Sequence, residues 1–140
     1  KLSTTIGIPR NTVIEYLNSL EKAKLLHLLY ADLLSVKKMQ KPDKIFLDNP
    51  NLLYALASHP GKIGTARETF VVNQLSCDNE VEYGKKTGDF RVNGRYILEV
   101  GGEGKTYDQI ADVPDSYILA DGIETPYRCK LPIWIVGFLY

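Results

Sequence analysis

The sequence has little of what marks a metal-bound, disulfide-bonded or membrane-spanning protein. It contains two cysteines, Cys77 and Cys129, and two histidines, His27 and His59, and none of them lies in a paired spacing such as C-x-x-C. This scarcity argues against a zinc site and against a disulfide framework, and it favours free thiols in a reducing, cytoplasmic compartment. The longest apolar run, residues 131–140, is about half as long as a membrane helix. We therefore expect no membrane partner.

Net charge is also lacking, since 17 Lys and Arg balance 17 Asp and Glu in 140 residues. The charges are uneven, however, and residues 1–47 carry eight basic against four acidic side chains. This third of the chain is the better candidate for contacting an anion such as nucleic acid, although a solvated surface explains the surplus equally well. Apolar residues at 44% predict a globular chain with a packed core. Because the sequence begins inside a motif and without methionine, we expect it to be part of a longer protein.

Residues 1–47 have the pattern of a helix-turn-helix whose first part is missing. A short helix is expected from Leu2 to Ile6, and a break at Gly7-Ile8-Pro9 precedes a second helix that starts at Arg10. Two strands, Leu25 to Leu29 and Ile45 to Leu47, then flank a basic loop. A helix followed by two short strands around a basic loop describes a winged helix.

Winged helices that bind DNA place the start of their second helix in the major groove and contact phosphate with the loop between the strands. A protein partner is the alternative, because many winged helices bind protein and because Glu15 lies on the reading face. The residues expected to contact duplex DNA are Arg10, Asn11, Thr12, Lys37, Lys38 and Lys41.

The turn-forming cluster at residues 48–51 marks a boundary, so we expect a second, α/β domain over residues 48–140. Its strands and helices follow from apolar periodicity, except in residues 132–140, where strand and helix cannot be distinguished. The expected helices are Leu52 to Ala57, Thr65 to Ser76 and Tyr107 to Ala111, and the expected strands are Val81 to Tyr83, Asp89 to Val92, Tyr96 to Val100 and Tyr117 to Ala120.

The glycine loop after the strand at Tyr96 to Val100 ends in Gly104-Lys105-Thr106, as a phosphate-binding P-loop does. A P-loop also requires a glycine five residues before Gly104. That position is Glu99, whose carboxylate would repel phosphate and whose Cβ would obstruct the turn. The segment therefore does not predict a nucleotide site.

Three acidic residues predict a different site: Glu68 on a helix, and Asp89 and Glu99 on neighbouring strands. Carboxylates in apolar strands are costly without a partner, and such groups can hold Mg²⁺ for phosphodiester cleavage. Other roles remain open. Asp89 can end a turn and pair with Lys85 or Lys86, and Glu68 can complete a capping box that begins at residue 65.

The Asn93-Gly94 turn decides whether the two strand acids share a face. A two-residue turn pairs Val92 with residue 95 and leaves Asp89 and Glu99 on opposite faces. A three-residue loop over residues 92–94 pairs Asp89 with residue 97 and places both acids on one side. The metal-site hypothesis therefore predicts an odd loop, or a bulge near Gly88.

The stretch from Gly88 to Val100, with Arg67-Glu-Thr-Phe70 and Ile8-Pro-Arg-Asn-Thr-Val13 before it, resembles the C-terminal part of prokaryotic AAA-type ATPases. In that family an ATPase domain precedes a winged helix and a domain similar to PD-(D/E)xK restriction endonucleases. The resemblance implies that ATP binds only in an ATPase domain before residue 1. It also implies Asp89 and Glu99 as the nuclease acids and Glu68 as the helix acid.

The family pattern places a lysine two residues after the second acid, where this chain has Gly101. Lys105, at the end of the glycine loop, is the expected substitute, and Lys85 and Lys86 are further candidates. The leading hypothesis is an accessory ATPase region that binds nucleic acid or protein and has weak or no catalysis, without a cofactor of its own. The alternatives are a Mg²⁺-dependent DNA nuclease using Asp89, Glu99 and Lys105, and a winged-helix transcription regulator whose second domain senses a ligand.

Overall fold

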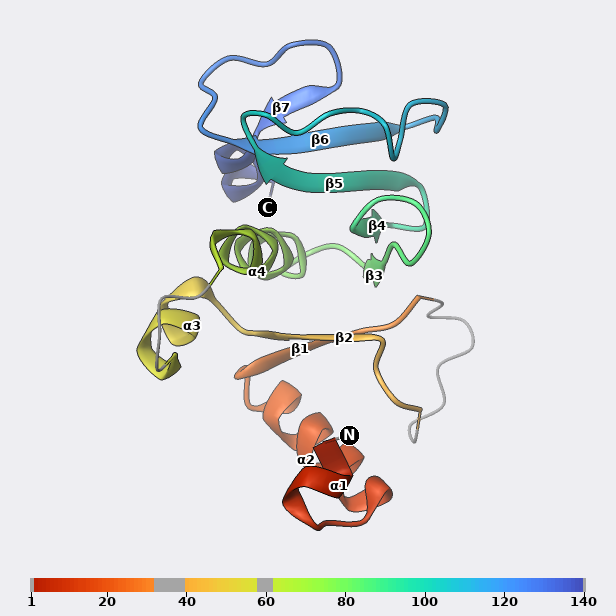
Figure 1. Ribbon diagram of the computed structural model, residues 1–140, viewed down its shortest axis with the longest axis vertical. Helices are drawn as coiled ribbons and strands as arrows, with labels where there is room; N and C mark the ends of the chain where they lie inside the picture. Colours follow the sequence, from red (N-terminus) through yellow and green to blue (C-terminus); the bar gives the residue numbers. More distant parts are fainter. Residues whose placement is uncertain (1, 32–39, 58–61, 140) are drawn as a thin grey trace.

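The computed structural model describes residues 2–31, 40–57 and 62–139, and its architecture is mixed α/β, as expected (Figure 1). None of its described helices is long and apolar enough to cross a membrane. The elements are, in chain order, α1 (Leu2–Ile6), α2 (Arg10–Lys22), β1 (Leu26–Leu29), β2 (Lys44–Leu47), α3 (Pro50–Leu56), α4 (Ile63–Leu75), β3 (Val81–Tyr83), β4 (Phe90–Val92), β5 (Tyr96–Gly102), β6 (Ser116–Asp121), β7 (Lys130–Pro132) and the 3₁₀ helix η2 (Ile133–Phe138).

The N-terminal elements are two helices followed by a two-stranded antiparallel hairpin. Gly7 joins α1 to α2 with a φ of 68°, a conformation that glycine adopts without strain. The strands β1 and β2 pair so that His27 lies opposite Phe46. The two helices and two strands expected in residues 1–47 are confirmed. Every end that was predicted lies within one residue of the observed end.

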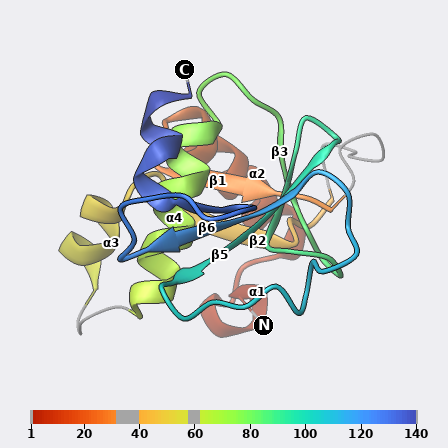
Figure 2. The same ribbon diagram turned by 90° about the horizontal axis from the view of Figure 1, so that it is seen from above.

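Helix α4 lies between this hairpin and a five-stranded sheet (Figure 1), and η2 runs beside it (Figure 2). Its apolar residues are spread around the helix and are not confined to one face, as is expected of a helix covered on several sides. Val71 and Val72 are fully buried. The helix therefore joins the hairpin to the sheet.

The sheet has the strand order β3-β4-β5-β6-β7. Strands β3, β4 and β5 form an antiparallel meander, and β6 and β7 continue the sheet in parallel to β5. One face, which includes Leu98 and Val100, packs against α4 and η2. The other face carries Ile97 and Ile118 and is covered by Ile110 from the segment between β5 and β6.

The largest buried cluster extends from the hairpin into the sheet. Leu29 and Phe46 of the hairpin belong to the same cluster as the sheet residues Phe90 and Leu119. The rings of Phe46 and Phe90 meet edge to face, with centroids 5.8 Å apart. Apolar packing is thus continuous across the boundary expected near residue 48.

Three sequence predictions need correction or completion. The segment Tyr107 to Ala111 forms turns and no helix, because its bonds run from Ile110 N–H to Tyr107 O and from Val113 N–H to Ile110 O, and Pro114 follows. The sequence did not distinguish strand from helix in residues 132–140. In the described part of this segment, Pro132 ends β7 and Ile133–Phe138 form η2.

The capping box at Thr65 is also wrong, because α4 begins two residues earlier than expected, at Ile63. Lys62 is the N-cap residue and makes no side-chain capping hydrogen bond. Glu68 therefore lies beyond the first turn of α4, where its carboxylate is free to serve another element.

The β4–β5 turn differs from both alternatives considered from the sequence. Asn93 and Gly94 have positive φ, as in the type I′ turn that Asn-Gly favours. Arg95 is an additional residue, because Val92 pairs with Tyr96. The loop is therefore odd, as the shared-face hypothesis requires, but it comprises residues 93–95 and not 92–94.

A bulge accompanies this loop at the other end of β4. Phe90 pairs with Leu98, and the N–H of Asp89 also donates to the carbonyl of Leu98, at 2.8 Å. Asp89, directly before β4, and Phe90, its first residue, thus both oppose Leu98 of β5, which defines a β-bulge. The preceding Gly88 has a φ of 69°. The expectation of a bulge near Gly88 is confirmed.

Candidate functional site

Glu99 is the centre of the candidate site. It lies in the middle of β5, on the face opposite Leu98 and Val100, and is only 1% exposed. Its neighbours on that face include Ile97 and the buried Ile118. A carboxylate in such surroundings is stable only with hydrogen-bond donors or a cation next to it.

Lys105 supplies one of these partners. Its Nζ contacts Oε1 of Glu99. The aliphatic stem of Lys105 lies over Gly101, where a Cβ would come within 2.8 Å of the Cβ and Cγ of Lys105. Glycine at position 101 therefore leaves the space through which Lys105 reaches Glu99. The lysine that contacts Glu99 thus comes from the following loop, and the position two residues after Glu99 is glycine.

Gln109 supplies the second partner, which the sequence analysis did not predict. The orientation of its amide follows from its surroundings, with Nε2 toward the carboxylate. In this orientation Nε2 donates to both oxygens of Glu99, at 3.1 and 3.2 Å. Glutamine is usually a surface residue, so its type gave no signal. Gln109 is exposed in the structure as well, and only its amide group turns toward Glu99.

The electrostatics of Glu99 reflect both its burial and its neighbours. Burial raises the pKa of Glu99 above its ordinary value, whereas the hydrogen bond and charge of Lys105 lower it. The negative charges of Asp89 and Glu68 raise this pKa further. These two acids are therefore close enough to act on Glu99, and the net shift is upward.

Asp89 is held at the bulge beside Glu99. Its Oδ2 accepts a hydrogen bond of 2.9 Å from the N–H of Val100, the residue after Glu99. The structure thus brings Asp89 to the part of β5 that carries Glu99. The alternative pairings of Asp89 with Lys85 or Lys86 are not among the hydrogen bonds and ion pairs of the described residues.

Glu68 faces the hairpin. Its Oε2 pairs with Nζ of Lys44 at 3.1 Å, and this ammonium group also lies 5.1 Å from the ring centroid of Tyr83. The neighbouring Arg67 binds Asp121 at 2.9 Å and so fixes α4 to the end of β6. Glu68 is therefore positioned between the N-terminal hairpin and the acidic site.

A divalent cation is the ligand that the sequence analysis expects at these acids. Within the described ranges, no three His, Cys, Asp or Glu side chains are arranged to hold a metal ion. Mg²⁺, however, usually takes one or two protein carboxylates and keeps water or substrate oxygens as its other ligands. Asp89 and Glu99 would be the two carboxylates of such an open site, with Lys105 in contact with Glu99. They do not fit a closed protein cage.

The residues expected to contact nucleic acid lie at the start of α2 and near β2. Arg10, Asn11 and Lys41 are exposed, and Thr12 is partly buried. Arg10 and Lys41 line the same cavity of about 380 Å³ between α2 and β2. The structure thus brings these two basic residues to one surface. The expected phosphate contacts Lys37 and Lys38 lie outside the described residues.

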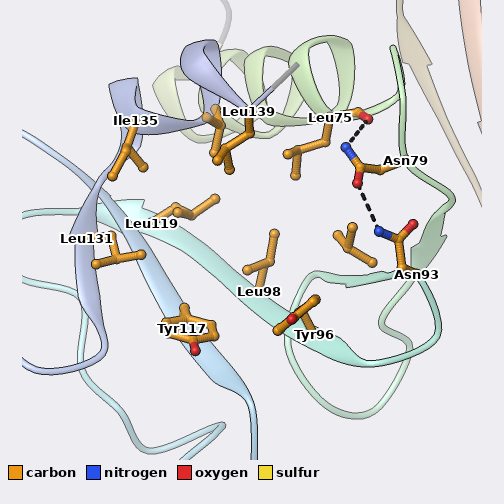
Figure 3. A pocket seen from close by; sticks show the side chains of 12 residues that line it. Leu75, Asn79, Asn93, Tyr96, Leu98, Tyr117, Leu119, Leu131, Ile135 and Leu139 are labelled. Carbon is orange, nitrogen blue, oxygen red and sulfur yellow. Dashed lines mark hydrogen bonds between the residues drawn. The ribbon is translucent and has the colours of Figure 1, made fainter.

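A separate apolar pocket of about 450 Å³ lies on the other face of the sheet, between β4–β7 and the helices α4 and η2 (Figure 3). Leu75, Leu98 and Leu139 point into it. At its rim Nδ2 of Asn93 donates to Oδ1 of Asn79 at 2.9 Å. The β-sheet separates this pocket from Glu99.

The chain was compared with protein-family models, curated proteins and solved structures, and no match was found in any of the three. The fold and the site geometry are therefore the basis for assigning a function.

Proposed function

We propose that this chain is the accessory region of an AAA-type ATPase, in which a winged helix is joined to a nuclease-like domain and engages nucleic acid. The observation that carries the proposal is the topology around the acids. An α-helix precedes a three-stranded antiparallel meander, and a fourth strand is parallel to the third. Asp89 directly precedes β4 and Glu99 lies in β5, and these would be the two acids of the nuclease pattern.

The N-terminal elements support the nucleic-acid part of the proposal. Their order of two helices and an antiparallel hairpin is that of a winged helix, with α2 as the recognition helix. Arg10 begins α2, and Lys41 is exposed close to the start of β2. Both are positioned to neutralise phosphate when α2 enters a groove.

Duplex binding at several salt concentrations tests this proposal. We expect Arg10→Ala with Lys41→Ala to weaken duplex binding and to lower the salt slope by about one for each lost phosphate contact. Lys22→Ala is the matched control, because Lys22 is exposed at the opposite end of α2. Absence of any salt-dependent binding by the unmodified chain would contradict the nucleic-acid role and favour a protein partner.

A Mg²⁺-dependent DNA nuclease is a second candidate, which the contact between Lys105 and Glu99 favours. A bound Mg²⁺ would polarise the phosphate and activate a water molecule. Asp89 and Glu99 would hold the cation, and Lys105 would place positive charge beside the phosphate.

Cleavage of plasmid DNA separates the two candidates. A nuclease should cleave only with Mg²⁺, lose cleavage in Asp89→Ala, and slow by about 10²-fold or more in Lys105→Met. Gly104→Ala is the control, because a Cβ at Gly104 meets no atom within 4 Å. Binding of duplex without cleavage would exclude the nuclease candidate and support an accessory role.

A further inference from the structure

Two side chains of the segment that follows β5 contact Glu99. Lys105 reaches it over Gly101, and Gln109 reaches it from the first of the turns that replace the expected helix. Lys105 was expected to have a role at this site from the sequence, whereas Gln109 was not. Gln109 is nevertheless the residue whose side chain spans both carboxylate oxygens.

The two contacts restrict Glu99 differently. Lys105 neutralises charge at Oε1, and an ammonium group has no fixed plane. Gln109 donates to Oε1 and Oε2 at nearly equal distances, 3.1 and 3.2 Å. A donor shared by both oxygens fixes the rotation of the carboxylate. Gln109 therefore sets the direction in which Glu99 presents its oxygens.

The segment that carries both donors is itself fixed. Ile110, next to Gln109, is 2% exposed and packs with Ile118. Nζ of Lys130 donates to the carbonyl oxygens of Glu103 and Lys105, the latter at 3.0 Å. Both donors thus approach Glu99 from a backbone that is anchored on each side of them.

We propose that Gln109 is a positioning residue that holds the Glu99 carboxylate in the orientation required at the acidic site. The inference rests on the proposed nuclease-like site, because the orientation of Glu99 matters only where its oxygens meet a cation or a phosphate. Gln109 acts through Glu99.

The contact is tested first by a double-mutant cycle in the metal-free chain. Gln109→Met keeps the length of the side chain and removes the donor. We expect it to lower the Tm of the unmodified chain by about 4 °C, and to have no measurable effect in a Glu99→Met background, where no carboxylate remains to be held. Equal decreases in both backgrounds would overturn the proposal, because the effect of Gln109 would then not pass through Glu99.

The positioning role is tested by titrating Mn²⁺ into the folded chain by calorimetry. We expect Gln109→Met to weaken Mn²⁺ binding about tenfold, as loss of a partner that orients a metal ligand does, and Gly104→Ala to leave the affinity unchanged. Unchanged affinity in Gln109→Met would overturn the positioning role. If the unmodified chain binds no Mn²⁺, the nuclease candidate is wrong. The double-mutant cycle measured by Tm then still tests whether Gln109 acts through Glu99.

Discussion

The protonation of Glu99 is tied to folding because its side chain is almost fully buried. Burial raises its folded-state pKa, so the folded chain holds this proton at pH values where the unfolded chain has released it. The contribution of Glu99 to stability is therefore fully present below its unfolded pKa. It is lost as the pH rises through the higher folded pKa.

This linkage predicts a pH-dependent difference between the unmodified chain and Glu99→Gln, whose amide does not titrate. As the pH rises through the raised folded pKa, the unmodified chain should lose stability relative to Glu99→Gln, and the difference should then level off. Urea unfolding at a series of pH values measures it. A difference that is constant with pH would show that Glu99 titrates alike in both states.

Gly101 provides a second residue-scale prediction. The Cβ of Gly101→Ala would occupy the path of the Lys105 stem and so separate Lys105 from Glu99. We expect the free energy of unfolding to fall by about 1–3 kcal/mol, against about 0.5 kcal/mol or less for Gly104→Ala. Adding Lys105→Met to Gly101→Ala should cost little more, and fully additive losses in urea unfolding would contradict this explanation.

The β4–β5 hairpin is the element on which the candidate site depends. Gly88 begins the bulge, and a Cβ there would lie 2.7 Å from Cγ2 of Ile97 and 2.9 Å from the carbonyl oxygen of Leu98. Gly94, in the turn, has a similar positive φ of 66° but no atom within 4 Å of its Cβ position. A substitution at Gly94 therefore measures the cost of the positive φ alone. A substitution at Gly88 adds the cost of a steric clash to it.

We expect Gly94→Ala to cost about 1 kcal/mol from its positive φ alone. Gly88→Ala should cost about 2–4 kcal/mol, because its contacts with β5 add to the same strain. Chemical denaturation of the two variants makes the comparison. Equal losses would show that the bulge can shift without consequence for β5.

The elements that could be predicted from the sequence are those whose side chains alternate or repeat locally. Val81 to Tyr83 was predicted to the residue because its apolar and polar residues alternate. The register of the hairpin was not predicted, because it depends on the additional residue Arg95. Nor was the site role of Gln109, since the bonds that carry it to Glu99 are formed across turns and leave no periodic pattern.

At the scale of the whole molecule, the hairpin and the sheet share one apolar core. Phe46 is 5% exposed and belongs to the same buried cluster as Val136 of η2. Because a shared core links the stability of its parts, residues 1–47 and 48–140 should unfold together. The division of the chain into two domains near residue 48 stays a prediction.

Phe46→Ala tests this coupling. We expect a loss of about 3–5 kcal/mol in one transition, observed alike by far-UV circular dichroism and by the fluorescence of Trp134, which lies in η2. Leu56→Ala is the control, because Leu56 is 69% exposed. A fluorescence transition that Phe46→Ala leaves unchanged would show two independent units.

The space above Gly101 also restricts how sequences of this kind can vary. Only one long side chain fits there, so a lysine at position 101 and a lysine reaching over it from position 105 exclude each other. Restoring the lysine of the nuclease pattern by a single substitution would bring the two stems into conflict. Homologous chains should therefore change these two positions together, with a lysine at one accompanied by a different residue at the other.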